Sequence, residues 1–390
     1  MANSLLTPNV IAKEALLQLE NSMVMGNLVH RDYKKEFVKV GGTITVRKPV
    51  IFAASDGATR VNQDVSEQST TLTVGSRKHV SWNFSSQDLT LTIDEYSKRY
   101  IKPAMNALAN QVDMDLCGLF TGVYRAAGTA GTTPSTFANV AAAGQKLDES
   151  ACPQEERRLV VNPAGYWSLA GSLLTLYNQN IVKEAAQKGY LGRFANFETY
   201  MDQNITKQTR GVATGTPVSN GVNQSGSSII TNGWTASTNG ILNAGDIITF
   251  AGVYEVNPQS KLATSSLKQF VVTAAVNSDS GGNATVAVSP ALVTSGNYQN
   301  GSGPIVNGSA VTVTGSHTAN LAFHKNAFAL VMVPLELPDG APFKAQESYN
   351  GMSVRVVKDY DVTNDIEIIR LDIMYGVSAI YPELAVRLLG

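Results

Sequence analysis

The stretch Thr92–Tyr124 carries apolar residues at three- and four-residue steps, the spacing of one helix face. These residues are Ile101, Met105, Leu108, Val112, Leu119 and Val123. Thr92 and Glu95 have the spacing of a capping box, so we expect a helix that begins there. It would be on the order of 45 Å long, with a bend near Arg99 because Pro103 lacks an amide donor. Such a helix spans a plate-like subunit, pairs with another chain, or belongs to an ordinary globular core.

A second helical pattern opens the chain. Thr7 is a suitable N-cap, Pro8 suits the first helical position, and Gly26 is a plausible stop. The apolar stripe of this helix consists of Ile11, Ala15, Leu19 and Met23. Nothing nearby in the sequence covers the stripe, so it docks either on another subunit or on the body of its own chain. Ile11 and Leu19 are therefore candidate contacts between subunits.

Between Gly41 and Phe84 the period changes to two, which predicts strands. The alternating runs are Ile44–Val50, Thr70–Val74 and His79–Phe84. We interpret them as a long two-stranded excursion that returns to the long helix. Two strands cannot bury a core, so this excursion is expected to be an arm that reaches out from a body.

The arm has a basic character. Its cations are Arg47, Lys48, Arg60, Arg77 and Lys78. They form either a solvated face or ion pairs with acidic groups of an adjacent subunit. We take these five residues as further candidate contacts between subunits.

The middle of the chain mixes helices and strands. Phe137–Leu147 reads as an Ala-rich helix and Arg157–Val161 as a short buried strand. Asn162-Pro163 supplies an N-cap and a first-turn residue for a helix that extends to about Tyr177. Tyr190–Asn204 alternates like a strand. This pattern is typical of an α/β body.

At about Gly211 the composition changes, and through about Ser316 the only charged residues are Asp246, Glu255, Lys261, Lys268 and Asp279. Strand candidates in this region are Ile247–Tyr254, Phe270–Val276, Ala284–Val288 and Val311–Thr314. They indicate a small antiparallel β module inserted into the main fold. A flexible glycine-rich loop is the alternative, which the recurrent Val and Ile runs disfavour.

After the insert the chain returns to the style of the first part. Leu321–Leu337 is apolar, and two β runs follow at Ser353–Val357 and Ile366–Val377. Arg355 and Arg370 have acidic neighbours and look structural.

Composition limits the function classes. The 390 residues carry a formal net charge of −1 and only 16% are charged, so no global attraction to nucleic acid or anionic membrane is expected. Cys117 and Cys152 are the only cysteines and are expected to be reduced. No signal peptide and no run of about 18 apolar residues is present, so we expect synthesis in the cytosol without passage through a membrane.

No chemical site emerges from the motifs. The four histidines have no carboxylate or cysteine at ligand spacing, and no nucleophile elbow, phosphate loop or dinucleotide fingerprint occurs. We therefore predict no catalytic, cofactor-binding or metal-binding residues. A carboxylate pair assembled in space from distant residues stays open at this stage.

Five segments, taken in order, resemble tailed-phage major capsid proteins, most closely the coat protein family of short-tailed Salmonella-type phages. The segments are Leu108–Asp113, Asn162–Tyr166, Gly245–Val253, Phe323–Ala327, and Tyr375–Ala379 with Pro382-Glu383. The resemblance covers nearly the whole chain. It implies an α+β protein with the Johnson fold, named for the Hong Kong 97-type capsid. The implied parts are an N-terminal arm (1–40), an extended β loop (41–90), the spine helix with peripheral and axial parts (91–210), an inserted β domain (211–316), and the remainder with a C-terminal strand (317–390).

The resemblance also implies a function. Such a protein self-assembles from hexamers and pentamers into an icosahedral shell that encloses packaged double-stranded DNA, with which it has only non-specific proximity. A scaffolding protein, a portal and in some cases a decoration protein take part, no membrane does, and synthesis takes place in the bacterial host cytoplasm. One departure concerns the insert, whose loop Asn257–Lys268 offers only Lys261 and Lys268 for ion pairs between capsomers. Apolar contacts or a decoration protein would then replace such pairs.

The primary hypothesis is therefore a structural shell protein without catalytic activity. A carbohydrate-binding or adhesive β-rich surface protein is the alternative, suggested by the Ser-, Thr- and Asn-rich module and weakened by the missing secretion signal. An enzyme with a dispersed site is the third possibility.

Overall fold

The computed structural model describes residues 8–32, 42–52, 67–85, 97–173, 191–362 and 366–390, together with residues 57, 60 and 62. The chain divides into two compact units. Unit 1 comprises residues 1–46, 69–117 and 328–380, and unit 2 comprises residues 47–68, 118–327 and 381–390. The expected cap at Thr7, the capping box at Thr92 and Glu95, and the helix end near Tyr177 lie outside the described residues.

Unit 1 contains a five-stranded antiparallel sheet built around β19 (Ile366–Ala379). The other strands are β3 (Ser76–Ser85), β16 (Phe328–Met332), β17 (Phe343–Tyr349) and β18 (Met352–Asp361). Ten residues of β3 pair with β19 in continuous register, from Ser76 opposite Tyr375 to Ser85 opposite Ile366. The third alternating run, His79–Phe84, thus belongs to the five-stranded sheet of unit 1. Its prediction as part of a reaching arm is wrong. Its backbone groups find partners in a strand that lies far away in the sequence.

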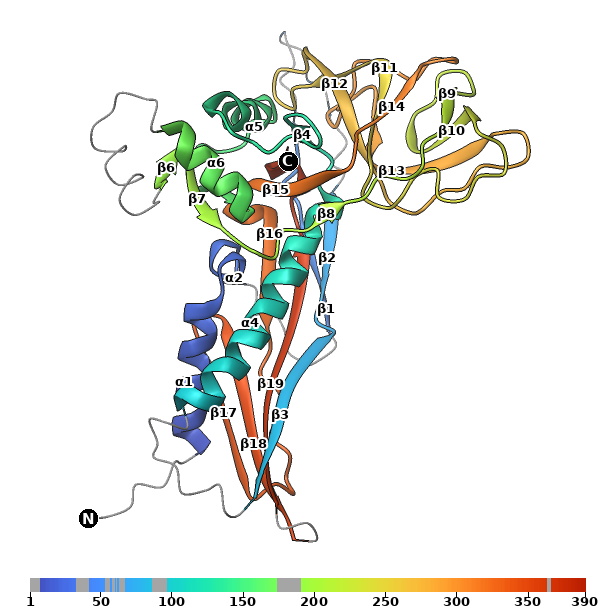
Figure 1. Cartoon of the computed structure of the whole chain (residues 1–390). Coiled ribbons are helices and arrows are strands. Elements are labelled where there is room, and N and C mark those ends of the chain that lie inside the picture. Colours follow the sequence, from blue (N-terminus) through green and yellow to red (C-terminus); the bar gives the residue numbers. More distant parts are fainter. Residues whose placement is uncertain are drawn as a thin grey trace. The chain divides into compact units, whose positions relative to one another are not determined.

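Two helices pack on one face of this sheet. α1 (Pro8–Ser22) contacts β17, β18 and α4 (Lys102–Cys117), and α4 also contacts β19 and β3 (Figure 1). The α1 side chains of Ile11 and Leu19 are 3% and 0% exposed. Of the two docking alternatives, the N-terminal stripe therefore takes the body of its own chain.

The predicted long helix is partly correct. Its described part consists of a π-helical turn at Ser97–Ile101, then α4, then a 3₁₀ turn at Gly118–Gly122. The α-helix itself has 16 residues, or about 24 Å, because the glycines after Cys117 disfavour its continuation. The π-helical turn lies immediately before Pro103, where a bend was expected.

Gly26 does not end the first helix. α1 ends at Ser22, and Gly26 lies in the short α2 (Met25–Leu28). The buried carboxylate of Asp113 on α4 accepts hydrogen bonds from the amides of Val24 at 2.7 Å and Gly26 at 2.8 Å. This carboxylate holds the turn between α1 and α2 against α4.

Among its described residues, the first part of the arm contains two short strands, β1 (Thr43–Arg47) and β2 (Ser69–Thr73), which pair with each other. Strand β2 contacts β19, and the hydroxyl of Ser378 donates to the carbonyl of Thr71 at 3.2 Å. Leu72 is fully buried. The returning strand is therefore attached to the sheet of unit 1.

Unit 2 contains a seven-stranded sheet covered by α5 (Phe137–Glu149) and α6 (Pro163–Leu173). Its strands run in the order β4, β20, β15, β5, β7, β6, and β8 pairs with β15. They are β4 (Ala126–Ala127), β5 (Arg157–Val161), β6 (Arg193–Phe194), β7 (Phe197–Met201), β8 (Lys207–Gln208), β15 (His317–His324) and β20 (Ala385–Leu389). The Asn162 cap is confirmed, since its Oδ1 accepts from the amide of Gly165 at 3.0 Å.

The low-charge region forms a six-stranded antiparallel sheet within unit 2, in the order β14, β11, β12, β13, β10, β9. The strands are β9 (Gly215–Ser219), β10 (Gly226–Trp234), β11 (Ile247–Val256), β12 (Ala263–Val272), β13 (Ala284–Leu292) and β14 (Val311–Val313). Val218 bridges to Ala310, so the two ends of the sheet approach each other around one apolar core. The predicted β module is confirmed and the flexible-loop alternative is wrong, although β9 and β10 were not predicted.

Candidate assembly surfaces and buried ionic centres

The candidate cations of the arm do not lie together. Arg47, Lys48 and Arg60 belong to unit 2, whereas Arg77 and Lys78 belong to β3 in unit 1. The Arg47 side chain is 76% exposed and pairs at 3.1 Å with Glu67, which is 51% exposed. Arg60 is exposed as well. Of the three arm cations in unit 2, Arg47 and Arg60 are therefore the exposed ones.

Lys48 forms its contacts within unit 2. Its Nζ lies 3.0 Å from Glu383 Oε1 and 5.3 Å from the ring centre of Tyr381, and its side chain is 17% exposed. Lys78 is half-buried on β3, opposite Ile373. Ile11 and Leu19 are buried within their own chain, and Lys48 pairs with Glu383, so these three candidate subunit contacts also have partners inside the chain.

The carboxylate of Asp372 on β19 is fully buried and faces three arginines. Arg355 Nη2 lies 2.7 Å from Oδ2, while Arg370 Nε at 2.8 Å and Arg77 Nη2 at 3.4 Å lie near Oδ1. Burial raises the pKa of Asp372, but the hydrogen bonds and charges of Arg355 and Arg370 outweigh it, so this pKa lies below its ordinary value. The structural interpretation of Arg355 and Arg370 is correct, and Arg77 joins them.

A second ionic centre lies inside unit 2, around Glu255 on β11. Arg125 donates to Glu255 Oε1 from Nε at 2.8 Å and from Nη2 at 2.6 Å. Lys268 on β12 and Lys146 on α5 each lie 3.9 Å from this carboxylate. Both Arg125 and Lys268 also lie 5.0 Å from the ring centre of Tyr124. The centre thus joins the inserted sheet to α5 and to the chain beside β4.

Burial and charge act in opposite directions on Glu255. Burial raises its pKa, but the charges of Arg125, Lys268 and Lys146 and the hydrogen bond from Arg125 outweigh this, so the pKa lies below its ordinary value. Burial lowers the pKa of Lys268 to about 8, although Glu255 opposes the shift. Glu255 therefore stays ionised at neutral pH.

Polar contacts from other elements hold the same region. The amide group of the Gln269 side chain exchanges two hydrogen bonds with the backbone of Ala126, at 2.8 and 3.0 Å. The fully buried Arg387 on β20 donates to the carbonyls of Gly245 at 2.7 Å and Val123 at 2.8 Å. Gly245 has a φ of +91°, and a Cβ there would lie 2.9 Å from Gln208 Oε1. The backbone conformation and the close packing at position 245 therefore favour glycine.

The charged loop residues of the insert are also engaged within the chain. Lys261 Nζ donates to the carbonyl of Asn297, and Lys268 is 2% exposed. Asn257 donates from its side chain to the carbonyl of Glu149 on α5 at 3.0 Å. The loop also carries an exposed apolar residue, Leu262, which is 71% exposed.

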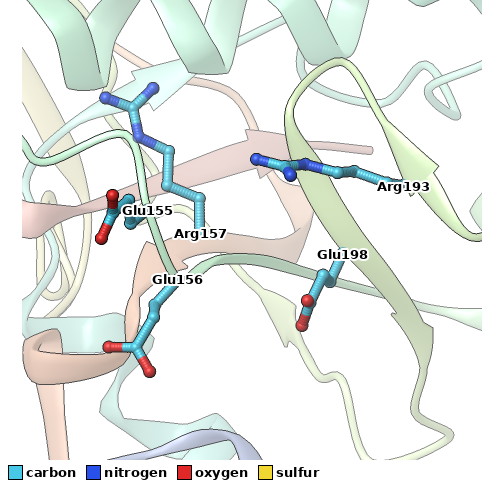
Figure 2. Close-up of a pocket in the computed structure, with 5 residues that line it drawn as sticks. All are labelled: Glu155, Glu156, Arg157, Arg193 and Glu198. Atoms are coloured by element: carbon cyan, nitrogen blue, oxygen red, sulfur yellow. The ribbon is translucent and has the colours of Figure 1, made fainter.

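A cavity of about 140 Å³ in unit 2 is lined by Glu155, Glu156, Arg157, Arg193 and Glu198 (Figure 2). Its charges are largely matched, since Glu156 pairs with Lys325 at 3.4 Å and Arg158 lies 3.9 Å from Glu198. In Figure 2 the guanidinium of Arg157 points away from the Glu156 carboxylate, in agreement with its 2.6 Å bond to Asp148. The cavity contains no nucleophile with an adjacent base.

In the described part of the chain, no group of three or more His, Cys, Asp or Glu side chains is placed to hold a metal ion. Cys117 and Cys152 are free and buried. Within the same described ranges, none of the helices has the length and apolar character needed to cross a bilayer. The features that stand out are ionic centres and exposed cations.

Sequence reasoning missed the Glu255 centre, and in the Asp372 centre it missed Arg77. In the insert, a partial signal was present, since charges are rare in its strands and a charged residue that a strand buries needs a partner. Glu255 and Lys268 fit that description. Arg125, 130 residues before Glu255, carries no local signal at all.

Comparisons with solved structures place the fold. A structure from Mycobacterium phage Che8 is similar, with a TM-score of 0.51 and 13% identity over 94% of this chain and 90% of that one. The capsid structure of Cyanophage P-SCSP1u gives a TM-score of 0.47 and 12% identity over 90% and 84% of the two chains. The comparison with curated protein sequences gives no match. The fold is that of Hong Kong 97-type phage capsid proteins, a class of shell-forming structural proteins.

The sequence itself identifies the family. The family model described as "P22 coat protein - gene protein 5" matches residues 1–390. The chain belongs to this family and is the major capsid protein of a tailed bacteriophage, a structural protein and not an enzyme. The resemblance seen in the sequence is thereby confirmed, and no observation favours a carbohydrate-binding protein.

Proposed function

We propose that Arg47 and Arg60 join neighbouring copies of this coat protein by pairing with their acidic groups. The observation that carries the proposal is the exposure of both side chains. Arg47 is 76% exposed, and its pair with the half-exposed Glu67 contributes at most about 1 kcal/mol. Arg47 can therefore leave Glu67 and pair with an acidic group of another copy, where two matched surfaces exclude water.

The inserted module contributes apolar contacts in this proposal. Lys261 and Lys268 both have partners inside the chain, whereas Leu262 is a large apolar residue that the loop exposes. Leu262 then packs against a neighbouring capsomer or against a decoration protein. This supports the departure from charged contacts that the sequence suggested.

The finer organisation is proposed from the family. Many copies form hexamers and pentamers of an icosahedral shell around double-stranded DNA, with a scaffolding protein and a portal, after synthesis in the host cytoplasm. The proposed parts are the N-terminal arm (1–40), the extended loop (41–90), whose last strand β3 joins the sheet of unit 1, the spine helix region (91–210), the inserted domain (211–316) and the remainder (317–390). The strands of the insert lie between Gly215 and Val313, which supports its borders.

The test is charge reversal at the open cations. Arg47→Glu with Arg60→Glu is expected to give a folded subunit that no longer forms shells, because exposed substitutions change stability by about 0.5 kcal/mol or less. Particles are counted by electron microscopy and sedimentation, and folding is followed by thermal melting. Arg210→Glu, the same change at another exposed position, is the matched control and should assemble. Normal shells from the double variant would exclude the proposed contacts.

A further inference from the structure

The two faces of the five-stranded sheet in unit 1 are covered differently. Side chains alternate along a strand, so odd- and even-numbered residues of β19 point to opposite faces. The Tyr375 hydroxyl donates a hydrogen bond to Asp115 Oδ2 of α4, with 2.6 Å between the two oxygens. The odd-numbered residues therefore lie on the face covered by helices. Asp372 and Arg370 therefore lie on the other face. Among the described elements, strand β2 covers this face near Gly376, where a Cβ would lie 2.3 Å from the carbonyl oxygen of Thr73.

Neighbouring strands add to the charge of this face. Residues directly opposite each other in an antiparallel pair share a face, so Arg355 and His79, both opposite Asp372, lie beside it. Arg77 reaches the same carboxylate from the end of β3. We call Arg77, Arg355 and Arg370 the arginine face.

The arginine face has more positive charge than its partner can balance. In the part of the chain that the structure describes, Asp372 is the one carboxylate within 4.0 Å of these three guanidiniums. Its two oxygens receive all three, which leaves two positive charges in excess. Lys344, also on this face, lies 3.9 Å from Asp339, and that pair cancels itself.

The excess is accessible. The side chains of Arg77 and Arg370 are 46% and 38% exposed, whereas Arg355 is 11% exposed and also donates to the carbonyl of Glu336. One guanidinium suffices to neutralise a buried carboxylate, and additional like charges repel each other. Two partly exposed arginines held in place by a buried carboxylate form a preorganised site for an external anion, because guanidinium binds oxyanions in a fixed geometry.

The surroundings favour a carboxylate over nucleic acid. A protein that makes about 6–10 phosphate contacts binds duplex DNA with a steep salt dependence, and two excess charges supply far fewer contacts. The same face continues into apolar positions, including Ile368, which is 39% exposed. A mixed apolar and cationic surface is typical of a protein interface. A coat protein meets many copies of itself, so a second copy is the partner at hand.

We propose that the arginine face binds an acidic side chain of a second copy of this chain, with Arg77 and Arg370 as the contacting residues. This inference rests on the proposed pairing of cations with acidic groups between copies, and it moves that contact for Arg77 from the arm to the body sheet. It also assigns Arg370 a role outside its own chain.

Cross-linking identifies the partner directly. Arg370→Lys keeps the charge and supplies an amine, which a carbodiimide couples to a carboxylate in contact with it. Shells are made from an equal mixture of ¹⁴N- and ¹⁵N-labelled chains and analysed by mass spectrometry. Peptides that join position 370 to an Asp or Glu with mixed isotopes are expected. Lys344 is the internal control, since its link to Asp339 should contain a single isotope.

Neutralisation measures the contribution of the contact. Arg370→Gln with Arg77→Gln leaves Arg355 bound to Asp372, so the subunit is expected to fold. Loss of the contact is expected to raise the concentration needed for shell formation at least about fivefold. If cross-links at position 370 reach only Asp372 of the same chain or a different protein, the second copy is not the ligand.

The outcomes separate this inference from the proposed function. An unchanged threshold for the Gln variants, together with failed assembly of the Arg47 and Arg60 variant, overturns the arginine face and keeps the arm contacts. An unchanged threshold with shells that retain less DNA assigns the face to nucleic acid and also overturns the proposal. Should the Gln variants fail to fold, the cross-linking of Arg370→Lys decides alone.

Discussion

Glu255→Gln is the most informative single change in unit 2. Glu255 is 2% exposed and accepts two hydrogen bonds from Arg125, at 2.8 and 2.6 Å. Removal of its charge leaves Arg125 and Lys268 buried without a counter-charge. Loss of one partner of a buried ion pair costs about 3–5 kcal/mol. Gln can still accept from Arg125, so we expect a loss near the lower limit, about 3 kcal/mol.

The assay is urea unfolding of the unassembled subunit, followed by circular dichroism and by hydrogen exchange with mass spectrometry. The exchange measurement tells whether α5 and the β11–β12 hairpin lose protection first, because these elements meet at the centre. Glu198→Gln is the matched control. Its side chain is 55% exposed and lies 3.9 Å from Arg158, so a loss below about 0.5 kcal/mol is expected.

Two results would refute this reasoning. One is an unfolding free energy for Glu255→Gln within about 0.5 kcal/mol of the wild-type value. The other concerns coupling: Lys268→Met in the Glu255→Gln background should recover part of the loss, because it removes one of the unbalanced cations. Strict additivity of the two changes would show that Lys268 does not interact with Glu255.

Two further predictions concern pH and the core. The pKa of Lys268 is about 8 in the folded chain and about 10.4 when unfolded, so between these values the unfolded state holds more protons and stability rises with pH. The Lys268→Met variant should lack this rise in stability, which is measured from the urea midpoints of variant and wild type at pH 8 and pH 9.5. An equal change of midpoint with pH in the two proteins would contradict the argument. Leu108→Asp, at a position that is 3% exposed, should abolish soluble expression because a buried unpaired carboxylate costs several kcal/mol, whereas Ala107→Asp on the exposed side of α4 should not. Wild-type melting of Leu108→Asp would mean that the stripe is not a core.

The sequence predicted the elements whose signals are local. The 3.6-residue period identified α1 and α4, and Asn162 identified the start of α6, because these features depend on neighbours within a turn. The β character of the insert followed from its alternating Val and Ile runs. Family-like segments spread along the chain were enough to indicate a phage coat protein. All of this information lies within short windows of the chain.

The pairing of distant segments was not predictable in this way. Strand β3 looks like the end of an arm until β19, almost three hundred residues later, supplies its hydrogen-bond partner. A strand shows its alternation in sequence but not the identity of the strand beside it. The basic arm was therefore misassigned in part, and Arg77 belongs to the sheet of unit 1.

The same limit applies to charge. The sequence by itself determined how few charges the insert has. From this it also indicated that ion pairs from the insert loop are not the main contact between capsomers. Only the tertiary structure decided that Glu255 meets Arg125, that Asp372 meets three arginines, and that Ile11 and Leu19 are covered by their own chain. Burial and electrostatic interaction depend on distance in space, and folding brings together groups whose separation along the chain carries no trace of that distance.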